Sequence, residues 1–237
     1  MAVAEREHAA VEVVDLATTS VRELNQRLHD LARTPGPRHW RVVNPSGAHA
    51  VACGLDADVE VEIDGHVGYY CAGMNKLATV RVHGNASTGI AENMMSGRVE
   101  VDGNVSQSAG ATGRGGLLVV RGTASSRCGI SMKGIDIVVG GSVGHMSAFM
   151  AQTGSLVVCG DAGEALGDSI YEARLYVRGS VASLGADCVE KELRDEHLAQ
   201  LRGLLDAAEM DVDAADFRRY GSARELYTFK IDNAGAY

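Results

Sequence analysis

Hydrophobic residues recur in this chain with a period of nineteen residues between positions 63 and 186. Each period contains two aliphatic positions that lie two residues apart. The first position holds Val61, Val80, Val99, Leu118, Ile137, Leu156 and Leu175, and the second holds Ile63, Val82, Val101, Val120, Val139, Val158 and Val177. A spacing of two is the period of a β-strand, whereas a helix needs spacings of three and four. The pattern therefore predicts one short strand in each of seven repeats.

A glycine follows the second aliphatic residue of every repeat after one intervening position. These structural turn glycines are Gly65, Gly84, Gly103, Gly122, Gly141, Gly160 and Gly179. Because glycine adopts positive φ without steric cost, we expect each one to form a tight turn. The residue seven positions later is always small, namely Ala72, Ala91, Gly110, Gly129, Ala148, Gly167 or Ala186. We expect this small residue to face the core and to let opposite walls approach closely.

A repeat of this length indicates a solenoid, and it is too short for a strand, a helix and two loops. Crossovers between parallel strands are right-handed in most proteins. We therefore predict an all-β protein, a right-handed parallel β-helix that forms a single-stranded solenoid of about seven to eight coils. A left-handed hexapeptide helix would need an aliphatic residue at every sixth position, and this chain does not keep one.

The segments on either side of the repeat are expected to cap it. Residues 11–16 alternate as a strand, and Ser20 with Glu23 forms a capping box that begins a helix ending near Ala32. Residues 40–54 have the glycine spacing of a degenerate first coil, one residue out of phase with the others. Bare strand edges at the ends of a solenoid recruit other chains, so terminal caps are expected.

At the other end, Asp187 and Glu190 are predicted to begin a charged helix that ends near Met210 and covers the last coil. We accordingly divide the chain into an N-terminal extension with a capping helix (residues 1–40), a parallel β-helix (residues 41–186), and a C-terminal helix and tail (residues 187–237). N-terminal and C-terminal helical caps thus complete the predicted fold.

Composition and charge exclude several classes of function. The net charge of −9 gives no basic patch for nucleic acid. Residues 1–10 lack the apolar run of a signal peptide, and the five cysteines include no CxxC pair, so we expect a cytoplasmic protein with buried, reduced cysteines. His66, His83 and His145 are expected on turns or outward faces, and Asp168 and Glu172 in exposed turns. We therefore predict no catalytic, cofactor-binding or metal-binding residue in this chain.

One edge of the repeats is rich in methionine, which suits adaptable contact surfaces. The candidate partner interface consists of Met94, Met95, Met132, Met146, Phe149 and Met150. The alternative is that these side chains turn inward and complete the core. The sequence alone leaves both possibilities open.

The glycine pattern resembles a known repeat. The spacing G-x-x-G-x-x-x-G, complete at Gly160, Gly163 and Gly167, is similar to that of the C-terminal β-helix domain of the glutamate synthase large subunit, the GXGXG-motif family. That family also includes a subunit of formylmethanofuran dehydrogenase. The segments GHVGYYCAGMN (65–75), CGISMKGIDIVVGG (128–141) and RRYGSARELY (218–227) further resemble the free-standing β-helix subunits of N-methylglutamate synthases, or methylamine–glutamate N-methyltransferases.

The resemblance implies a hetero-oligomer of three separate chains: a class II amidotransferase-like subunit, this β-helix subunit, and an FMN-binding glutamate synthase-like subunit. It implies a non-catalytic scaffold, with FMN in the partner subunit and no cofactor in this chain. In agreement, Met1 is followed by Ala2 rather than by the cysteine that class II amidotransferases use. Two alternatives stay open: a split glutamate synthase-like amidotransferase complex that uses another amine, and a self-sufficient β-helix protein that acts on polysaccharide.

Overall fold

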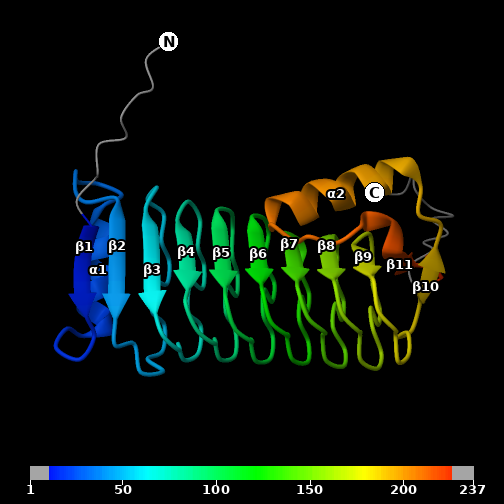
Figure 1. Cartoon of the computed structure of the whole chain (residues 1–237), viewed down its shortest axis with the longest axis horizontal. Coiled ribbons are helices and arrows are strands. Elements are labelled where there is room, and N and C mark those ends of the chain that lie inside the picture. The colour runs from blue at the N-terminus through cyan, green and yellow to red at the C-terminus, as the bar shows by residue number, and fades with distance from the viewer. Residues whose placement is uncertain (1–10, 226–237) are drawn as a thin grey trace, which may run out of the picture.

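The computed structural model describes residues 11–225, so the first ten residues and the end of the RRYGSARELY segment lie outside the described residues. The chain forms one 11-stranded sheet with the strand order β1-β2-β3-β4-β5-β6-β7-β8-β9-β11-β10 (Figure 1). The strands are β1 (Val11–Asp15), β2 (His39–Val43), β3 (Glu60–Asp64), β4 (Thr79–Val82), β5 (Arg98–Val101), β6 (Leu117–Val120), β7 (Lys133–Val139), β8 (Thr153–Val158), β9 (Arg174–Val177), β10 (Cys188–Lys191) and β11 (Arg218–Ser222). The helices are α1 (Val21–Asp30), α2 (Asp195–Ala207) and the short 3-10 helix η1 (Ala214–Asp216).

Strands β1 to β9 pair in parallel, each with the next along the chain. From β3 onward the partners lie nineteen residues apart, as in the pairs Val61–Val80 and Val80–Val99. A second, isolated parallel bridge joins neighbouring coils two residues after each turn glycine, beginning with Val67 and Ala86. These pairings confirm the predicted all-β parallel β-helix with one strand in each coil.

The aliphatic residues of the strands fill the inside of the coils. Val80 and Val82 are fully buried, whereas Arg81 between them points outward. Burying each such side chain contributes about 1.5–3 kcal/mol, so a ladder of them holds the rod together. The small residues seven positions after the glycines are also buried, as predicted, with the exception of Ala186 in the last coil.

The segment between each turn glycine and the next strand is called the arc of the coil. It contains alternating residues with positive φ, which the sequence did not predict. In one coil these are Tyr70, Ala72 and Met74, with φ values of 60°, 52° and 58°. Such angles cost about 1–2 kcal/mol in a residue with a side chain. The amides of Tyr70 and Met74 donate to Thr88 and Glu92 of the next coil, and that of Ala72 donates to the preceding coil. Hydrogen bonds along the rod therefore offset the backbone strain.

The expected reason for the turn glycines is wrong for most of them. Only Gly65 has positive φ, at 134°. The others are needed because neighbouring coils approach closely: a Cβ atom on Gly103 would lie 2.2 Å from Asn85 Oδ1 and 2.7 Å from the carbonyl oxygen of Gly84. Asn85 leans over this glycine to accept a hydrogen bond from the amide of Asn104, at 2.8 Å. A polar side chain thus stacks onto the glycine of the next coil.

The N-terminal cap agrees with the sequence analysis. Strand β1 adds a parallel rung to β2, and Ser20 caps α1 by accepting a hydrogen bond from the amide of Glu23. Leu24 and Leu28 of α1 are fully buried in the main core. Asn25 binds the first coil through both ends of its side-chain amide, because it donates to Ala50 O and accepts from the amide of Ala52. Helix α1 therefore closes the open end of the rod.

The degenerate first coil is also confirmed. Strand β2 stands in register with β3, and positive φ recurs at Ala50, Ala52 and Gly54. These residues lie twenty positions before Tyr70, Ala72 and Met74 rather than nineteen. Ala52 thus stands at the position of Ala72, so the glycine spacing, which matched Gly54 to that position, found the coil but placed its residues two positions out of register.

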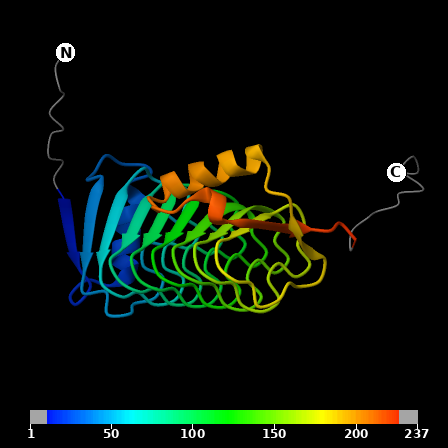
Figure 2. The same cartoon turned by 45° about the vertical axis from the view of Figure 1, so that its right-hand side comes forward.

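The prediction for the C-terminal cap is wrong in its boundaries and its placement. The segment after Asp187 forms strand β10, which pairs antiparallel with β11, and α2 begins only at Asp195. Strand β11 pairs antiparallel with β9 and so covers the last parallel edge. Helix α2 lies along the outer face of the sheet instead of across the end of the rod (Figures 1 and 2).

The side chains under α2 explain this placement. The outward positions of β6 to β9 that face it are apolar and fully buried: Val119, Val138, Val157 and Tyr176. Together with Leu201, Leu205, Ala208 and Phe217 they form a second hydrophobic core on the outside of the sheet. Burial of this outward apolar stripe holds α2 along the rod.

Candidate functional site

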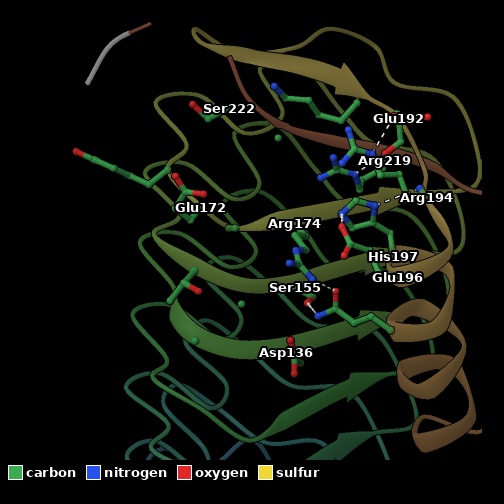
Figure 3. A pocket seen from close by; sticks show the side chains of 18 of the residues that line it. Asp136, Ser155, Glu172, Arg174, Glu192, Arg194, Glu196, His197, Arg219 and Ser222 are labelled. Carbon is green, nitrogen blue, oxygen red and sulfur yellow. Dashed lines mark hydrogen bonds and ion pairs between the residues drawn. The ribbon is translucent and has the colours of Figure 1, made fainter. Parts of the chain in front are cut away.

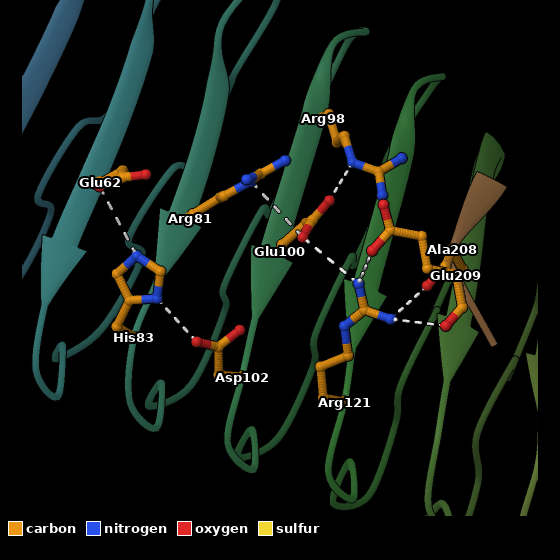
Figure 4. Close-up of polar contacts among 9 residues, drawn as sticks. All are labelled: Glu62, Arg81, His83, Arg98, Glu100, Asp102, Arg121, Ala208 and Glu209. Atoms are coloured by element: carbon orange, nitrogen blue, oxygen red, sulfur yellow. Dashed lines mark hydrogen bonds and ion pairs between the residues drawn. The ribbon is translucent and has the colours of Figure 1, made fainter. Parts of the chain in front are cut away.

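The outward face of the sheet is charged where α2 does not cover it. Glu62, Arg81 and Glu100 occupy there the positions that hold apolar residues farther along. Glu100 is almost buried, with 8% of its side chain exposed, and its carboxylate contacts Arg98 and lies 3.7 Å from both Arg81 and Arg121 (Figure 4). Three guanidinium groups thus surround one carboxylate.

Arg121 connects this charged face to α2. Its guanidinium donates to the carbonyl oxygen of Ala208 at the end of the helix and lies 3.3 Å from a carboxylate oxygen of Glu209 (Figure 4). The last carbonyl groups of a helix carry partial negative charge, which favours a cation at this position. Arg121 therefore fixes the C-terminal end of α2 against the sheet.

The three histidines singled out from the sequence lie on the surface, as expected. His83 stands between two carboxylates, with Nδ1 2.8 Å from Asp102 and Nε2 4.0 Å from Glu62 (Figure 4). His66 accepts a hydrogen bond from the amide of Asn85 in the turn stack. Both histidines thus take part in contacts between neighbouring coils.

A polar groove of about 850 Å³ lies where the N-terminal half of α2 meets the end of the sheet (Figure 3). Its floor includes Asp136, Ser155 and Arg174, which are neighbours across β7, β8 and β9. Lys191 and Arg219, paired across β10 and β11, also line it. The first turns of α2 supply the wall, with Arg194, His197 and Gln200. The groove therefore draws its side chains from six elements.

Gln200 organises the floor of the groove. Its Oε1 accepts hydrogen bonds from Arg174 Nη1 at 2.6 Å and from the Tyr176 hydroxyl at 3.0 Å. Its Nε2 donates to Ser155 Oγ at 3.1 Å, and Ser155 is fully buried. Burial raises the pKa of the neighbouring Asp136 carboxyl, while hydrogen bonds from Ser155 oppose that rise.

The far side of the groove carries a second guanidinium. Arg219 Nε donates to the backbone carbonyl of Glu192 at 3.0 Å. Burial lowers the pKa of Arg219, and the nearby Arg174 and Arg194 lower it further. Burial likewise lowers the pKa of His197, whose Nδ1 accepts a hydrogen bond from the amide of Arg194 at 3.2 Å. Burial is the main cause of both shifts, and the neighbouring guanidinium groups add to it.

Not every cation in the groove has an anionic partner. Arg194 pairs with Glu192 at 2.9 Å, and Arg224 pairs with Glu172 at 2.8 Å. Within residues 11–225, by contrast, Arg174, Lys191 and Arg219 have no carboxylate oxygen within 4.0 Å. All three are half-buried. The arrangement can therefore bind negative charge.

The sequence did not identify these groove residues. The groove forms only because β10 and β11 turn back onto β9 while α2 lies lengthwise on the sheet. One signal was available: Val119, Val138 and Val157 place an aliphatic residue at an outward position that holds charge in earlier coils. The change from charged to aliphatic residues indicates that this face is covered, but it does not identify the segment that covers it.

The structure corrects the candidate partner interface. Met94 and Met132 are fully buried and belong to the main core. They fill space that neighbouring glycines leave open, since a Cβ atom on Gly116 would lie 2.6 Å from Met94 Cε and one on Gly129 would lie 3.2 Å from Met132 Sδ. The inward alternative is therefore correct for these two residues.

Met95 and Met150 are exposed at 44% and 42%, and Met146 and Phe149 are half-buried. Several other large apolar side chains are exposed in nearby coils: Tyr69, Tyr70, Met74 and Leu77. Tyr69 stacks on His49 with ring centroids 4.5 Å apart. Met95 and Met150 of the candidate interface are therefore exposed, and exposed apolar side chains also occur outside the set first proposed.

All five cysteines are free, and all except the half-buried Cys53 are buried. Burial raises the pKa of Cys128 and of Cys188 to about 12, so both are uncharged thiols at neutral pH. The expected burial is confirmed for four of the five cysteines. Within the described part of the chain, no three side chains of His, Cys, Asp or Glu gather as a metal site would require. No helix found among residues 11–225 is long and apolar enough to span a bilayer.

The fold and the groove define this chain as a parallel β-solenoid with a cationic groove beside its C-terminal helix. It is 63% identical over 226 residues to a protein of Rhizobium meliloti (strain 1021) named Protein GlxC, and the match spans 95% of this chain and 99% of that protein. The chain therefore belongs to the GlxC family. A scan against models of protein families gave no match.

Proposed function

We propose that this chain is the structural subunit of a glutamate synthase-like complex. In the most specific form of the proposal, the complex is an N-methylglutamate synthase that makes N-methyl-L-glutamate from methylamine and L-glutamate. The observation that carries the proposal is the unbroken ladder of nineteen-residue coils, the repeat through which the sequence resembles such subunits. In this proposal the chain holds the catalytic subunits in place.

The physical character of the rod supports this role. Each coil is bonded to its neighbours by parallel strand pairing and by the amides of the arc, so the sides of the rod keep a fixed spacing. Helix α1 closes one end, and the antiparallel strands β10 and β11 cover the other. The long sides, rather than the ends, are therefore available for partners.

The sides of the rod differ in chemistry. The sheet face over β3 to β5 is charged, whereas Tyr69, Met74 and Met95 expose apolar side chains elsewhere on the same coils. Two different surfaces suit two different partners. We propose a class II amidotransferase-like subunit and an FMN-binding glutamate synthase-like subunit as these partners, with FMN held by the latter and the complex in the cytoplasm.

Reconstitution with one subunit omitted at a time tests this proposal. The three purified chains would be incubated with isotope-labelled methylamine and L-glutamate, and labelled N-methylglutamate would be measured. We expect product only when the β-helix chain and both partners are present. Undiminished product without the β-helix chain would contradict the scaffold role. A product that forms from ammonia or glutamine, but not from methylamine, would favour a split glutamate synthase-like amidotransferase instead.

A further inference from the structure

We propose that the groove between α2 and strands β9 to β11 binds a small molecule that carries two or more negative charges on carboxylate or phosphate groups. The proposal stands on the side chains of the groove alone. It does not depend on whether the chain is part of a glutamate synthase-like complex.

The first observation is the number of cations without a carboxylate partner. Arg174, Lys191 and Arg219 all line the groove, and none has a carboxylate oxygen within 4.0 Å in the described part of the chain. The whole chain carries a net charge of −9, so this local excess of positive charge departs from its average character. Three cations in one groove favour a ligand with more than one negative charge.

The second observation is that both guanidinium groups are held by neutral acceptors. Arg174 donates to the side-chain amide of Gln200 at 2.6 Å, and Arg219 donates to the backbone carbonyl of Glu192 at 3.0 Å. These contacts orient the side chains without neutralising their charge. Each guanidinium has five N–H donors, of which these contacts use one, so donors remain for a carboxylate or phosphate.

The third observation concerns the acidic residues of the groove. Glu192 and Glu172 are paired with Arg194 and Arg224, and Glu196 lies 3.4 Å from His197 Nε2. Asp136 receives hydrogen bonds from Ser155, which stands between it and Arg174 in the strand register. Four carboxylates thus line the groove against five Lys and Arg side chains, and none of the four lies within 4.0 Å of Arg174, Lys191 or Arg219 in the described part of the chain. Burial is the main cause of the lowered pKa of Arg219, and the nearby Arg174 and Arg194 add to it.

Size and position limit the ligand. A volume of about 850 Å³ lies in the range of small-molecule sites, which extends from roughly 300 to 1,000 Å³. The groove is built from regular strands and a helix that are packed on a second hydrophobic core. The cations are thus positioned before a ligand arrives, which lowers the entropic cost of binding.

Calorimetric titration of the full chain with citrate and, separately, with inorganic phosphate tests the proposal at constant ionic strength. We expect saturable binding of at least one of these probes. The comparison of the two distinguishes carboxylate from phosphate recognition. Arg174→Gln with Arg219→Gln should weaken binding about tenfold or more, because each removes a charged hydrogen bond. Arg33→Gln, an exposed arginine at the opposite end of the rod, is the matched control and should leave the affinity unchanged.

A second pair of variants keeps the test decisive if the double arginine variant does not fold. Lys191→Gln should weaken binding, and Asp136→Asn should strengthen it, because the two changes alter the charge of the groove in opposite directions. Binding of neither probe above the level seen with chloride would overturn the proposal. Affinities that stay the same in both of these variants would overturn it as well. Since only this chain is titrated, these outcomes are separate from those of the reconstitution experiment.

Discussion

Gly103 shows what the repeat demands of a single residue. A methyl group at this position would meet the carbonyl oxygen of Gly84 at 2.7 Å, and that backbone atom cannot rotate away. We expect Gly103→Ala to lower the free energy of unfolding by about 1–3 kcal/mol, the usual cost of overpacking. Chemical denaturation of the purified variant measures the change.

Gly203 in α2 provides the control for this substitution. Nothing lies within 4 Å of a Cβ atom built on it, and it stands inside a helix. Gly203→Ala should therefore raise the free energy of unfolding by up to about 1 kcal/mol, because alanine is the better helix former. If both variants changed stability in the same direction, close approach would not be the reason for the turn glycines.

Asp136 makes the free energy of unfolding depend on pH. Burial raises its pKa in the folded chain above the ordinary value of 3.8, so the folded state binds this proton more tightly than the unfolded state does. Ionised Asp136 therefore costs stability at neutral pH, and the cost disappears as the pH falls below 3.8. Asp136→Asn should raise the melting temperature at pH 7 and change it little at acidic pH.

Asp161 is the control, because its substitution should change the melting temperature at pH 7 in the opposite direction. Hydrogen bonds from the backbone amide and then the side chain of Ser180 lower the pKa of this exposed carboxyl. Its contribution to stability is present above pH 3.8 and is lost as the pH falls through the lowered pKa. Asp161→Asn should therefore lower the melting temperature at pH 7. Thermal unfolding of both variants from pH 3 to pH 8 would contradict this account if the two differences had the same sign.

For the methionines, the sequence could not predict which side chains face the core. Met94 and Met95 are adjacent, yet the first is fully buried and the second is 44% exposed. The arc between strands follows alternating positive φ values rather than a strand or a helix, so neither period says which side chain faces inward. The inward direction of Val80 and Val82, by contrast, follows directly from their spacing of two.

The position of helix α2 depends on contacts with residues that lie far from it in the sequence. Arg121 donates to the carbonyl of Ala208 and pairs with Glu209, and so fixes the last turn of the helix to the sheet. Arg121→Met should make the amides of this turn exchange with solvent faster and lower the free energy of unfolding by about 0.5–3 kcal/mol. Hydrogen exchange followed by mass spectrometry measures the first effect.

Arg81→Met is the matched control, because Arg81 pairs with the same Glu100 but forms no ion pair with α2 or Glu209 among residues 11–225. It should leave exchange in α2 unchanged. Equal effects of the two variants on the helix would show that loss of charge around Glu100, rather than the contact with Ala208, loosens α2.

The strands of the rod could be predicted from the sequence, whereas the C-terminal elements could not. Each strand from β3 to β9 carries a pair of aliphatic residues, and the equivalent pair in the next strand lies nineteen positions later. The register of each strand is therefore determined by its own residues. Strand β10 exists because β11, about thirty residues later, pairs with it. Because such pairing depends on a distant segment, Asp187 and Glu190 gave a helix signal that the tertiary structure overrides.

For the whole molecule, the exposed methionines provide a test of the proposed assembly. Met95→Glu with Met150→Glu should leave the chain folded, since exposed substitutions usually change stability by less than about 0.5 kcal/mol. Binding of a partner subunit should weaken, because a charge in an interface must be desolvated without a counter-charge. A pull-down of the co-expressed partner subunits, together with thermal unfolding, measures both effects.

The buried neighbour Met94 is the control. Met94→Glu places a charge in the core and should unfold the chain, so loss of binding in that variant carries no information about the interface. Undiminished binding by the Met95 and Met150 double variant would remove this edge from the interface.

At this scale the sequence predicted the rod but not the groove. The rod is a sum of nearly identical coils, so one repeat determines the next. The groove combines Arg174 from a coil, Arg219 from a returning strand and Gln200 from a helix laid over the sheet. No single segment carries that pattern, and it became visible only when the three were placed together.

The mass of the assembled complex tests the central claim most directly. The chain, with a mass of 24.9 kDa, would be mixed with the purified amidotransferase-like and FMN-binding subunits and analysed by size-exclusion chromatography with light scattering. We predict one species that contains all three chains and carries FMN, and no stable association of the two partners when the β-helix chain is left out. Elution of the β-helix chain by itself, with the two partners assembled without it, would contradict the account.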